Sequence, residues 1–148
     1  MFNKKKFRKG FTLIELLMVI AIMAILMAIM VPISTDYQVR NDLDVAQVTF
    51  AQAVRRAQQL SMASDSDGQW GVAAVSQNIV VFKGATYTGR DTSMDENYDI
   101  SSAIGISGQA EYDFAKQTGV PTQTGTVTFM NGNYLKTVVV NGKGIVNY

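Results

Sequence analysis

The sequence predicts an α+β fold, in which one long N-terminal helix packs on an antiparallel β-sheet formed by the C-terminal half. Two observations support this prediction. The chain is uninterruptedly apolar over residues 16–31 and then amphipathic, with helical spacing, to residue 64. Of its 12 glycines, all but Gly10 lie from Gly68 onward, where they alternate with short β-rich runs. A helical half followed by a strand-rich half is typical of the α+β class.

The composition narrows the possible functions. The 148 residues fit one ordinary domain, and a hydrophobic content of 47% supports a sizeable core. The chain has no Cys and no His. Their absence excludes a disulfide scaffold and thiolate zinc sites, and it removes the commonest catalytic base and metal ligand. We therefore expect neither an enzyme nor a bound cofactor.

The N-terminal region combines a basic tag with a long apolar segment. The tag carries five positive charges and no acid, at Lys4, Lys5, Lys6, Arg8 and Lys9. Residues 11–33 follow and would form a helix of about 35 Å, enough to cross the hydrocarbon core of a membrane. Because the basic residues precede the segment, we expect a single-pass helix with a cytoplasmic N-terminus and an extracytoplasmic head, residues 34–148.

Two other interpretations of this segment are weaker. A buried core helix would show a polar stripe, which residues 16–31 lack. A secretory signal peptide would have a shorter apolar run that ends at small residues, and the sequence after Val31 does not fit such a cleavage site.

A lone carboxylate, Glu15, lies near the start of the apolar segment. A charge at membrane depth is costly and calls for a cationic partner. Cleavage after Gly10 would create one, the α-amino group of Phe11, which stays largely charged at neutral pH. A neighbouring copy could then present its amine to Glu15. The alternative is a Glu15 at headgroup depth, stabilised by the positive end of the helix dipole. The residues alone leave both interpretations open.

The run from Lys9 to Leu16, K-G-F-T-L-I-E-L, closely resembles the prepilin signal of the type IV pilin superfamily, which includes the pseudopilins of type II secretion systems. The resemblance covers about the first thirty residues. It implies that residues 1–10 are a leader, that a prepilin peptidase cuts between Gly10 and Phe11, and that Phe11 becomes N-methylated. It also implies an assembly role for Glu15.

The resemblance has further implications for the fold, the partners and the location. The expected fold is the pilin fold, with Pro32 at the place where family members commonly carry a helix-kinking proline. Several family members have a glycine midway along this helix, and Ala24 stands in its place here. The resemblance therefore gives less support for local melting of the helix in the filament. The implied partners are the peptidase, other pilin or pseudopilin subunits and an inner-membrane assembly platform. The implied locations are the cytoplasmic membrane and then a pilus or pseudopilus filament.

Residues 34–64 are predicted to form an amphipathic helix with one buried face, because apolar residues recur at spacings of three and four. These residues are Val39, Leu43, Ala46, Phe50, Ala53, Val54, Ala57 and Leu60. We expect Pro32 to bend the helix, since proline removes a backbone donor. We expect the helix to end at residues 64–68, with Gly68 in the C-cap.

The remaining chain is predicted to be rich in strands and tight turns. The expected strands are residues 70–75, 79–82, 99–106, 111–114, 126–129, 135–140 and 145–148. Residues 76–78, 131–133 and 141–144 are typical of hairpin turns. The number of strands and the run over residues 137–145 resemble the H-type (FimT-like) minor pseudopilin group. This second resemblance is weaker than the first.

Two groups of charged residues in the head are candidates for function. Asp91, Asp95, Glu96 and Asp99 lie in a predicted polar loop, and their oxygens would suit calcium. Their spacing fits no metal motif, so a solvated acidic loop is the alternative and we assign no metal site. The pair Arg55 and Arg56 lies on the exposed helix face, where it could form salt bridges between subunits or remain solvated.

The function that the sequence favours is a structural filament subunit, a minor pilin or pseudopilin. The alternative is a DNA-binding minor pilin for DNA uptake. FimT-like members that bind DNA use basic residues near the C-terminus, whereas the last forty residues here contain only Lys116, Lys136 and Lys143. We therefore do not expect nucleic-acid binding.

Overall fold

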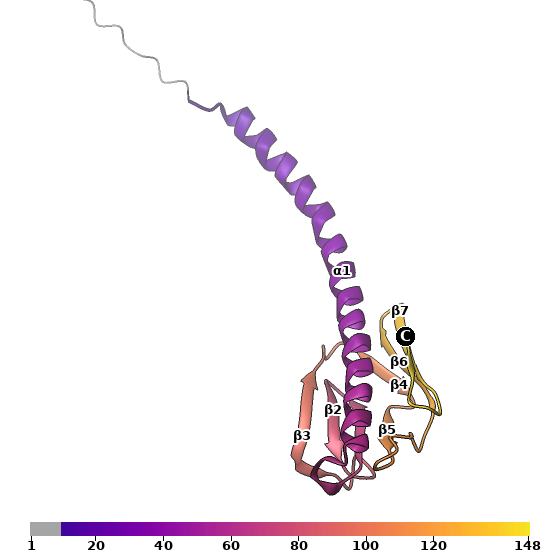
Figure 1. The fold of residues 1–148 in the computed structure, drawn as a ribbon. Coiled ribbons are helices and arrows are strands. Elements are labelled where there is room, and N and C mark those ends of the chain that lie inside the picture. Colours follow the sequence, from indigo (N-terminus) through magenta and orange to yellow (C-terminus); the bar gives the residue numbers. More distant parts are fainter. Residues whose placement is uncertain (1–9) are drawn as a thin grey trace, which may run out of the picture. The chain divides into compact units, whose positions relative to one another are not determined.

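The computed structural model describes residues 10–148, apart from the side chains of residues 30–34 (Figure 1). The first element of the described chain is one long helix, α1 (Leu13–Met62). The chain divides into two compact units, one ending at Tyr37 and the other comprising Gln38–Tyr148. We call the second unit the head. Its secondary structure confirms the α+β class and the pilin fold expected from the sequence.

The head contains two four-stranded antiparallel sheets, where the sequence analysis expected one. The first sheet has the order β3-β2-β1-β5 and the second has the order β4-β6-β7-β8. The strands of the first sheet are β1 (Trp70–Val75), β2 (Asn78–Lys83), β3 (Asp91–Asp99) and β5 (Glu111–Phe114). Those of the second are β4 (Gly105–Gly108), β6 (Gly125–Asn131), β7 (Tyr134–Val140) and β8 (Val146–Asn147).

The chain crosses between the two sheets at the short link after β4. The backbone N–H of Gln109 donates to Thr126 O of the second sheet (2.9 Å), whereas the carbonyl of Ala110 accepts from Ala74 N of the first (2.8 Å). Gly108 has a φ of +84°, and a Cβ at this position would lie 2.3 Å from Thr126 O. A residue with a side chain could therefore not take this path, and glycine is required at the crossing.

The core lies between the head part of α1 and the inner faces of both sheets. Leu43, Ala46, Phe50, Ala53, Val54, Ala57 and Leu60 are buried, which confirms the predicted stripe. Phe50 contacts both sheets, because its ring centroid lies 6.1 Å from Tyr112 of β5 and 5.6 Å from Phe129 of β6. The Tyr112 hydroxyl has no hydrogen-bond partner among the described residues. Burial raises the pKa of Tyr112 to about 12.

The end of α1 differs from the prediction. The first left-handed residue after the helix is Ser64, with a φ of +51°, and Ser66 and Asp67 also have positive φ. Gly68 is extended, with a φ of −126°. A buried side chain, Ser61, fixes this end to the sheet. Its Oγ accepts the N–H of Trp70 (2.8 Å) and donates to the Trp70 carbonyl (3.2 Å).

Replacing Ser64 with Gly should stabilise the head by about 1 kcal/mol, because glycine adopts the left-handed conformation without the Cβ clash. The Ser64 side chain makes no capping hydrogen bond that would be lost. Thermal unfolding should show the gain as a higher Tm. The control is Ser93→Gly in β3, where glycine removes a side chain from an extended strand and should lower the Tm.

Most of the predicted strands and all three hairpin turns are confirmed. The pairs Val75–Asn78, Asn131–Tyr134 and Val140–Val146 close the hairpins β1–β2, β6–β7 and β7–β8. The largest error concerns residues 91–106. The acidic stretch forms the strand β3 rather than a loop, and the expected strand over residues 99–106 is replaced by the end of β3 and the start of β4.

Candidate functional site

The residues predicted to act in N-terminal processing and assembly lie at the start of α1. Gly10 and Phe11 precede the helix, and both are exposed. The side chain of Thr12 caps it, since Thr12 Oγ1 accepts the backbone N–H of Glu15 (3.3 Å). This cap was not predicted from the sequence, although the spacing T-x-x-E before an apolar run is a recognised signature for it. The cap fixes the first turn of α1 close to the predicted cleavage position between Gly10 and Phe11.

Glu15 lies in the first helical turn and is exposed. A carboxylate in this turn interacts favourably with the positive end of the helix dipole. Among the described residues, Glu15 forms no ion pair with a Lys or Arg side chain within 4.0 Å. Its pairing with the α-amine of another subunit therefore stays a prediction.

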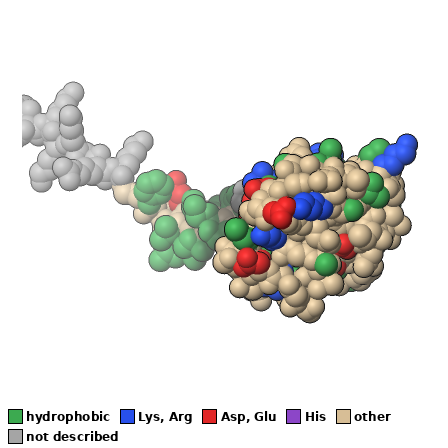
Figure 2. Space-filling model, turned by 60° about the horizontal axis from the view of Figure 1, so that its bottom comes forward, with side chains coloured by type: hydrophobic (Ala, Val, Ile, Leu, Met, Phe, Trp, Pro, Cys, Tyr) green, Lys and Arg blue, Asp and Glu red, His purple; other side chains and the backbone are tan. Residues whose placement is uncertain are grey.

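The first part of α1 presents apolar side chains on every face. The large hydrophobic residues from Phe11 to Ile29 are between 46% and 84% exposed. Figure 2 shows hydrophobic side chains in green along this stretch of helix. An apolar surface of this extent marks a site of association with another protein or with a membrane.

The expected transmembrane helix over residues 11–33 is not confirmed. Among the residues described with their side chains, 10–29 and 35–148, no helix reaches both the length and the apolar character needed to cross a membrane. Pro32 falls among the residues whose side chains lie outside the description, so the bend at this proline also stays a prediction.

The four acidic calcium candidates lie on β3, where two of them form ion pairs with arginines. Arg90 Nε donates to Asp95 Oδ2 (2.8 Å), and the side chains are 20% and 9% exposed. Arg56 binds Glu96 through two hydrogen bonds of 3.0 and 3.3 Å, and this contact lowers the pKa of Glu96. In the described part of the chain, no group of three acidic side chains is placed to hold a metal ion.

These contacts also change the interpretation of the two neighbouring arginines. Arg56 is engaged within the head by Glu96. Arg55 lies over the ring of Tyr148, with 5.8 Å from its Cζ to the ring centroid. The pair therefore serves two different intramolecular contacts and does not act as one cationic unit.

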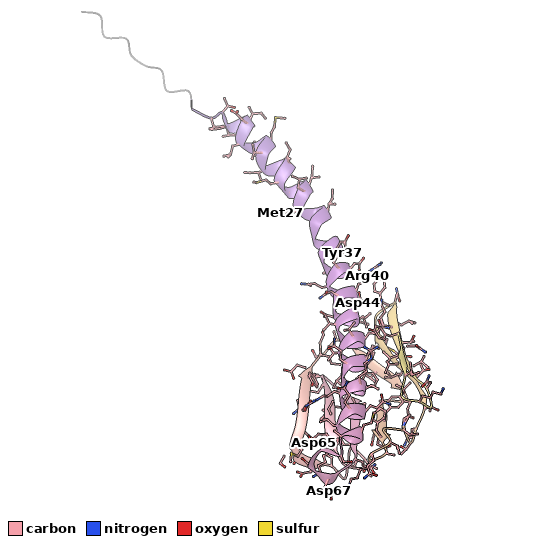
Figure 3. All side chains as sticks on the ribbon, in the orientation of Figure 1. Met27, Tyr37, Arg40, Asp44, Asp65 and Asp67 are labelled. Atoms are coloured by element: carbon pink, nitrogen blue, oxygen red, sulfur yellow. The ribbon has the colours of Figure 1, made fainter. Side chains whose placement is uncertain are left out.

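The lysines considered for DNA binding do not form one basic patch. Lys136 pairs with Asp44 of α1 (2.6 Å). Lys116 pairs with Asp67 beyond the other end of the head helix. Figure 3 labels Asp44 and Asp67 well apart on the head, so their lysine partners are also apart. Lys143 lies in the turn between β7 and β8.

Comparisons with known proteins agree with the N-terminal motif and the fold. A family model described as the prokaryotic N-terminal methylation motif matches residues 5–31. Two proteins from Pseudomonas aeruginosa, each named "Fimbrial protein", are 32% identical over 136 residues, which cover 91% of this chain and 78% of each relative. No solved structure matches the chain.

The motif and the helix-plus-sheet head define a filament-forming class of protein rather than an enzyme. The chain belongs to the type IV pilin superfamily and is a pilin-like structural subunit of a type IV fimbrial filament. Membership implies processing by a peptidase, assembly with other pilin subunits and attachment to a membrane.

Proposed function

We propose that the chain is a minor pilin or pseudopilin. It is made as a precursor with the leader 1–10, held in the cytoplasmic membrane by residues 11–33, and carries residues 34–148 outside the cytoplasm. A prepilin peptidase cleaves between Gly10 and Phe11 and N-methylates Phe11. The mature subunit then enters a pilus or pseudopilus filament from an inner-membrane assembly platform.

The observation that carries this proposal is the contrast between the two parts of α1. In the head, the apolar residues of α1 are covered by the two sheets, with Leu43, Phe50 and Val54 at most 1% exposed. Between Phe11 and Ile29, every large apolar side chain is exposed. Burying such a surface is worth about 25 cal/mol per Å². A lipid bilayer can bury this surface before assembly, and a bundle of identical helices can bury it in the assembled filament.

Glu15 fixes the axial register between the packed helices of neighbouring subunits. In an apolar bundle, an unpaired carboxylate is strongly disfavoured, whereas one paired with an amine is tolerated. If the partner is the α-amine of Phe11 on a neighbouring subunit, only particular axial offsets between helices satisfy both charges. The position of Glu15 in the first turn, close to Phe11, supports this arrangement.

Mass spectrometry of the protein recovered from filaments tests the processing step. We expect a mature chain that begins at Phe11 and carries one methyl group on its α-amine. A precursor with Gly10 replaced by Val should keep its leader, because the bulkier side chain blocks the cleavage position. An intact leader in the wild-type protein, or cleavage after residue 30, would contradict the proposal.

The DNA-binding alternative has no support from the geometry of the head. With two of three C-terminal lysines in ion pairs, too few free cations face one direction to displace DNA counterions. We expect no gel retardation of duplex DNA by the purified protein at low salt and micromolar concentration. If retardation did occur and weakened steeply with salt, the protein would be a DNA-uptake receptor instead.

A further inference from the structure

The outer face of the second sheet is an exposed surface without charged side chains. Side chains alternate between the two faces of a strand. Val127, Phe129, Val138 and Val140 are buried against the core, so the residues between them point outward. We define the uncharged face by six of these outward residues, Thr126, Thr128 and Met130 on β6 and Leu135, Thr137 and Val139 on β7.

The strand register makes these six residues one continuous surface. Met130 lies opposite Leu135, Thr128 opposite Thr137 and Thr126 opposite Val139. Leu135 is 64% exposed, and Met130 and Val139 are 39% and 38% exposed. Figure 1 shows β6 and β7 on the side of the head away from β3. The face therefore has the threonine pair Thr128 and Thr137 at its centre, with the apolar pair Met130 and Leu135 at one end and Val139 beside Thr126 at the other.

Charge is distributed unequally between the two sheets. The strands of the first sheet contain six acidic residues, Asp91, Asp95, Glu96, Asp99, Glu111 and Asp113, whereas those of the second contain none. The one charged residue in the second sheet, Lys136, lies opposite buried Phe129 and pairs with Asp44 of α1. It therefore belongs to the inner face.

This composition fits a protein partner of little charge. Anionic partners such as nucleic acid or an acidic membrane require Lys or Arg on the contact face, and none is present on it. Depletion of charge is the compositional signature of the core of a protein–protein interface. Thr and Val also have few rotamers, so fixing their side chains in a contact costs little entropy.

The area of the uncharged face indicates whether it can hold two free heads together or acts only between subunits of a filament. The uncharged face lies on two strands of seven residues each, and even the whole outer side of the second sheet, with the shorter β4 and β8, spans at most about 23 Å by 15 Å, or about 350 Å². A stable complex between two free proteins buries about 800 Å² on each partner. The face is therefore too small to hold free heads together, but it suffices between neighbours that a polymer already holds at millimolar effective concentration.

We propose that the uncharged face is the surface through which this head contacts the head of a neighbouring subunit in the filament. This inference rests on the proposed function, because the filament supplies the neighbour. Subunits that all point in one direction along a filament meet through two different surfaces. The uncharged face of one head thus packs on another surface of the next head, which should also be poor in charge.

Cysteine labelling tests the proposal, because the natural chain has no cysteine. Thr137→Cys introduces a thiol on the uncharged face, and Ser93→Cys introduces one at an exposed position of β3 in the first sheet. Both full-length variants should react with a maleimide when solubilised as single subunits. In purified filaments, Thr137→Cys should lose most of its labelling, while Ser93→Cys should stay reactive.

A photo-cross-linking residue at Leu135 identifies what covers the face. We expect adducts with the head of another pilin subunit. Full labelling of Thr137→Cys in filaments, equal protection of Ser93→Cys, or adducts with lipid, nucleic acid or a protein outside the filament would overturn the inference. If the wild-type protein were absent from filaments altogether, the proposed function itself would be wrong, which is a distinguishable result.

Discussion

Replacing Glu15 with Leu is expected to abolish most incorporation of the subunit into filaments while the head still folds. A hydrogen bond to a charged group contributes about 1.5–3 kcal/mol, so losing one at each subunit contact weakens assembly roughly ten- to a hundredfold. Membrane insertion should persist, because removing a charge from a membrane helix lowers its insertion free energy, by ~2.5–3.5 kcal/mol at the centre and less near the end. Immunoblots of sheared filaments measure incorporation, and immunoblots of membranes measure insertion.

Two variants separate the role of the Glu15 charge from simple changes in the helix. Glu15→Gln keeps the shape and removes the charge, so it should fail in assembly as Glu15→Leu does. Asp36→Leu removes another exposed carboxylate of α1 and should assemble normally. Normal incorporation of Glu15→Leu would show that the carboxylate only interacts with the helix dipole.

Replacing Phe50 with Ala should have the largest effect on the stability of the head. Phe50 is fully buried and contacts rings of both sheets. Removing a buried aromatic side chain costs about 3–5 kcal/mol, through lost burial and the cavity that remains. Because domains of this size are stable by about 5–15 kcal/mol, the variant should unfold at much lower denaturant concentration or fail to accumulate.

The matched control for Phe50 is Leu135→Ala, which truncates an exposed side chain in β7. This variant should keep the wild-type midpoint of denaturant unfolding within the small range typical of surface substitutions, about 0.5 kcal/mol. Phe50→Leu provides an intermediate case, since it keeps much of the side-chain volume. A loss below about 1 kcal/mol for Phe50→Ala would show that the sheets do not depend on this contact.

The sequence alone determined the elements whose signals are local. The buried stripe of α1 follows from apolar spacing, and the hairpins follow from turn residues such as Gly132 next to strand-forming runs. The N-terminal methylation motif over residues 5–31 is also local, because its residues follow one another along the chain. The strand β3 has no such signal. It is an edge strand of mostly exposed residues, so its acidic sequence shows no buried alternation.

Only the tertiary structure decided which strands pair and which charges meet. The short strands β4 and β5 look alike in length, yet β4 pairs with β6 in the second sheet and β5 pairs with β1 in the first. Arg56 and Glu96 are forty residues apart and meet only because β3 pairs with β2 beside α1. The uncharged outer face of β6 and β7 likewise depends on their register and on which side the core covers. Such contacts join distant residues, and their free energy becomes available only when the chain has closed the loops between them.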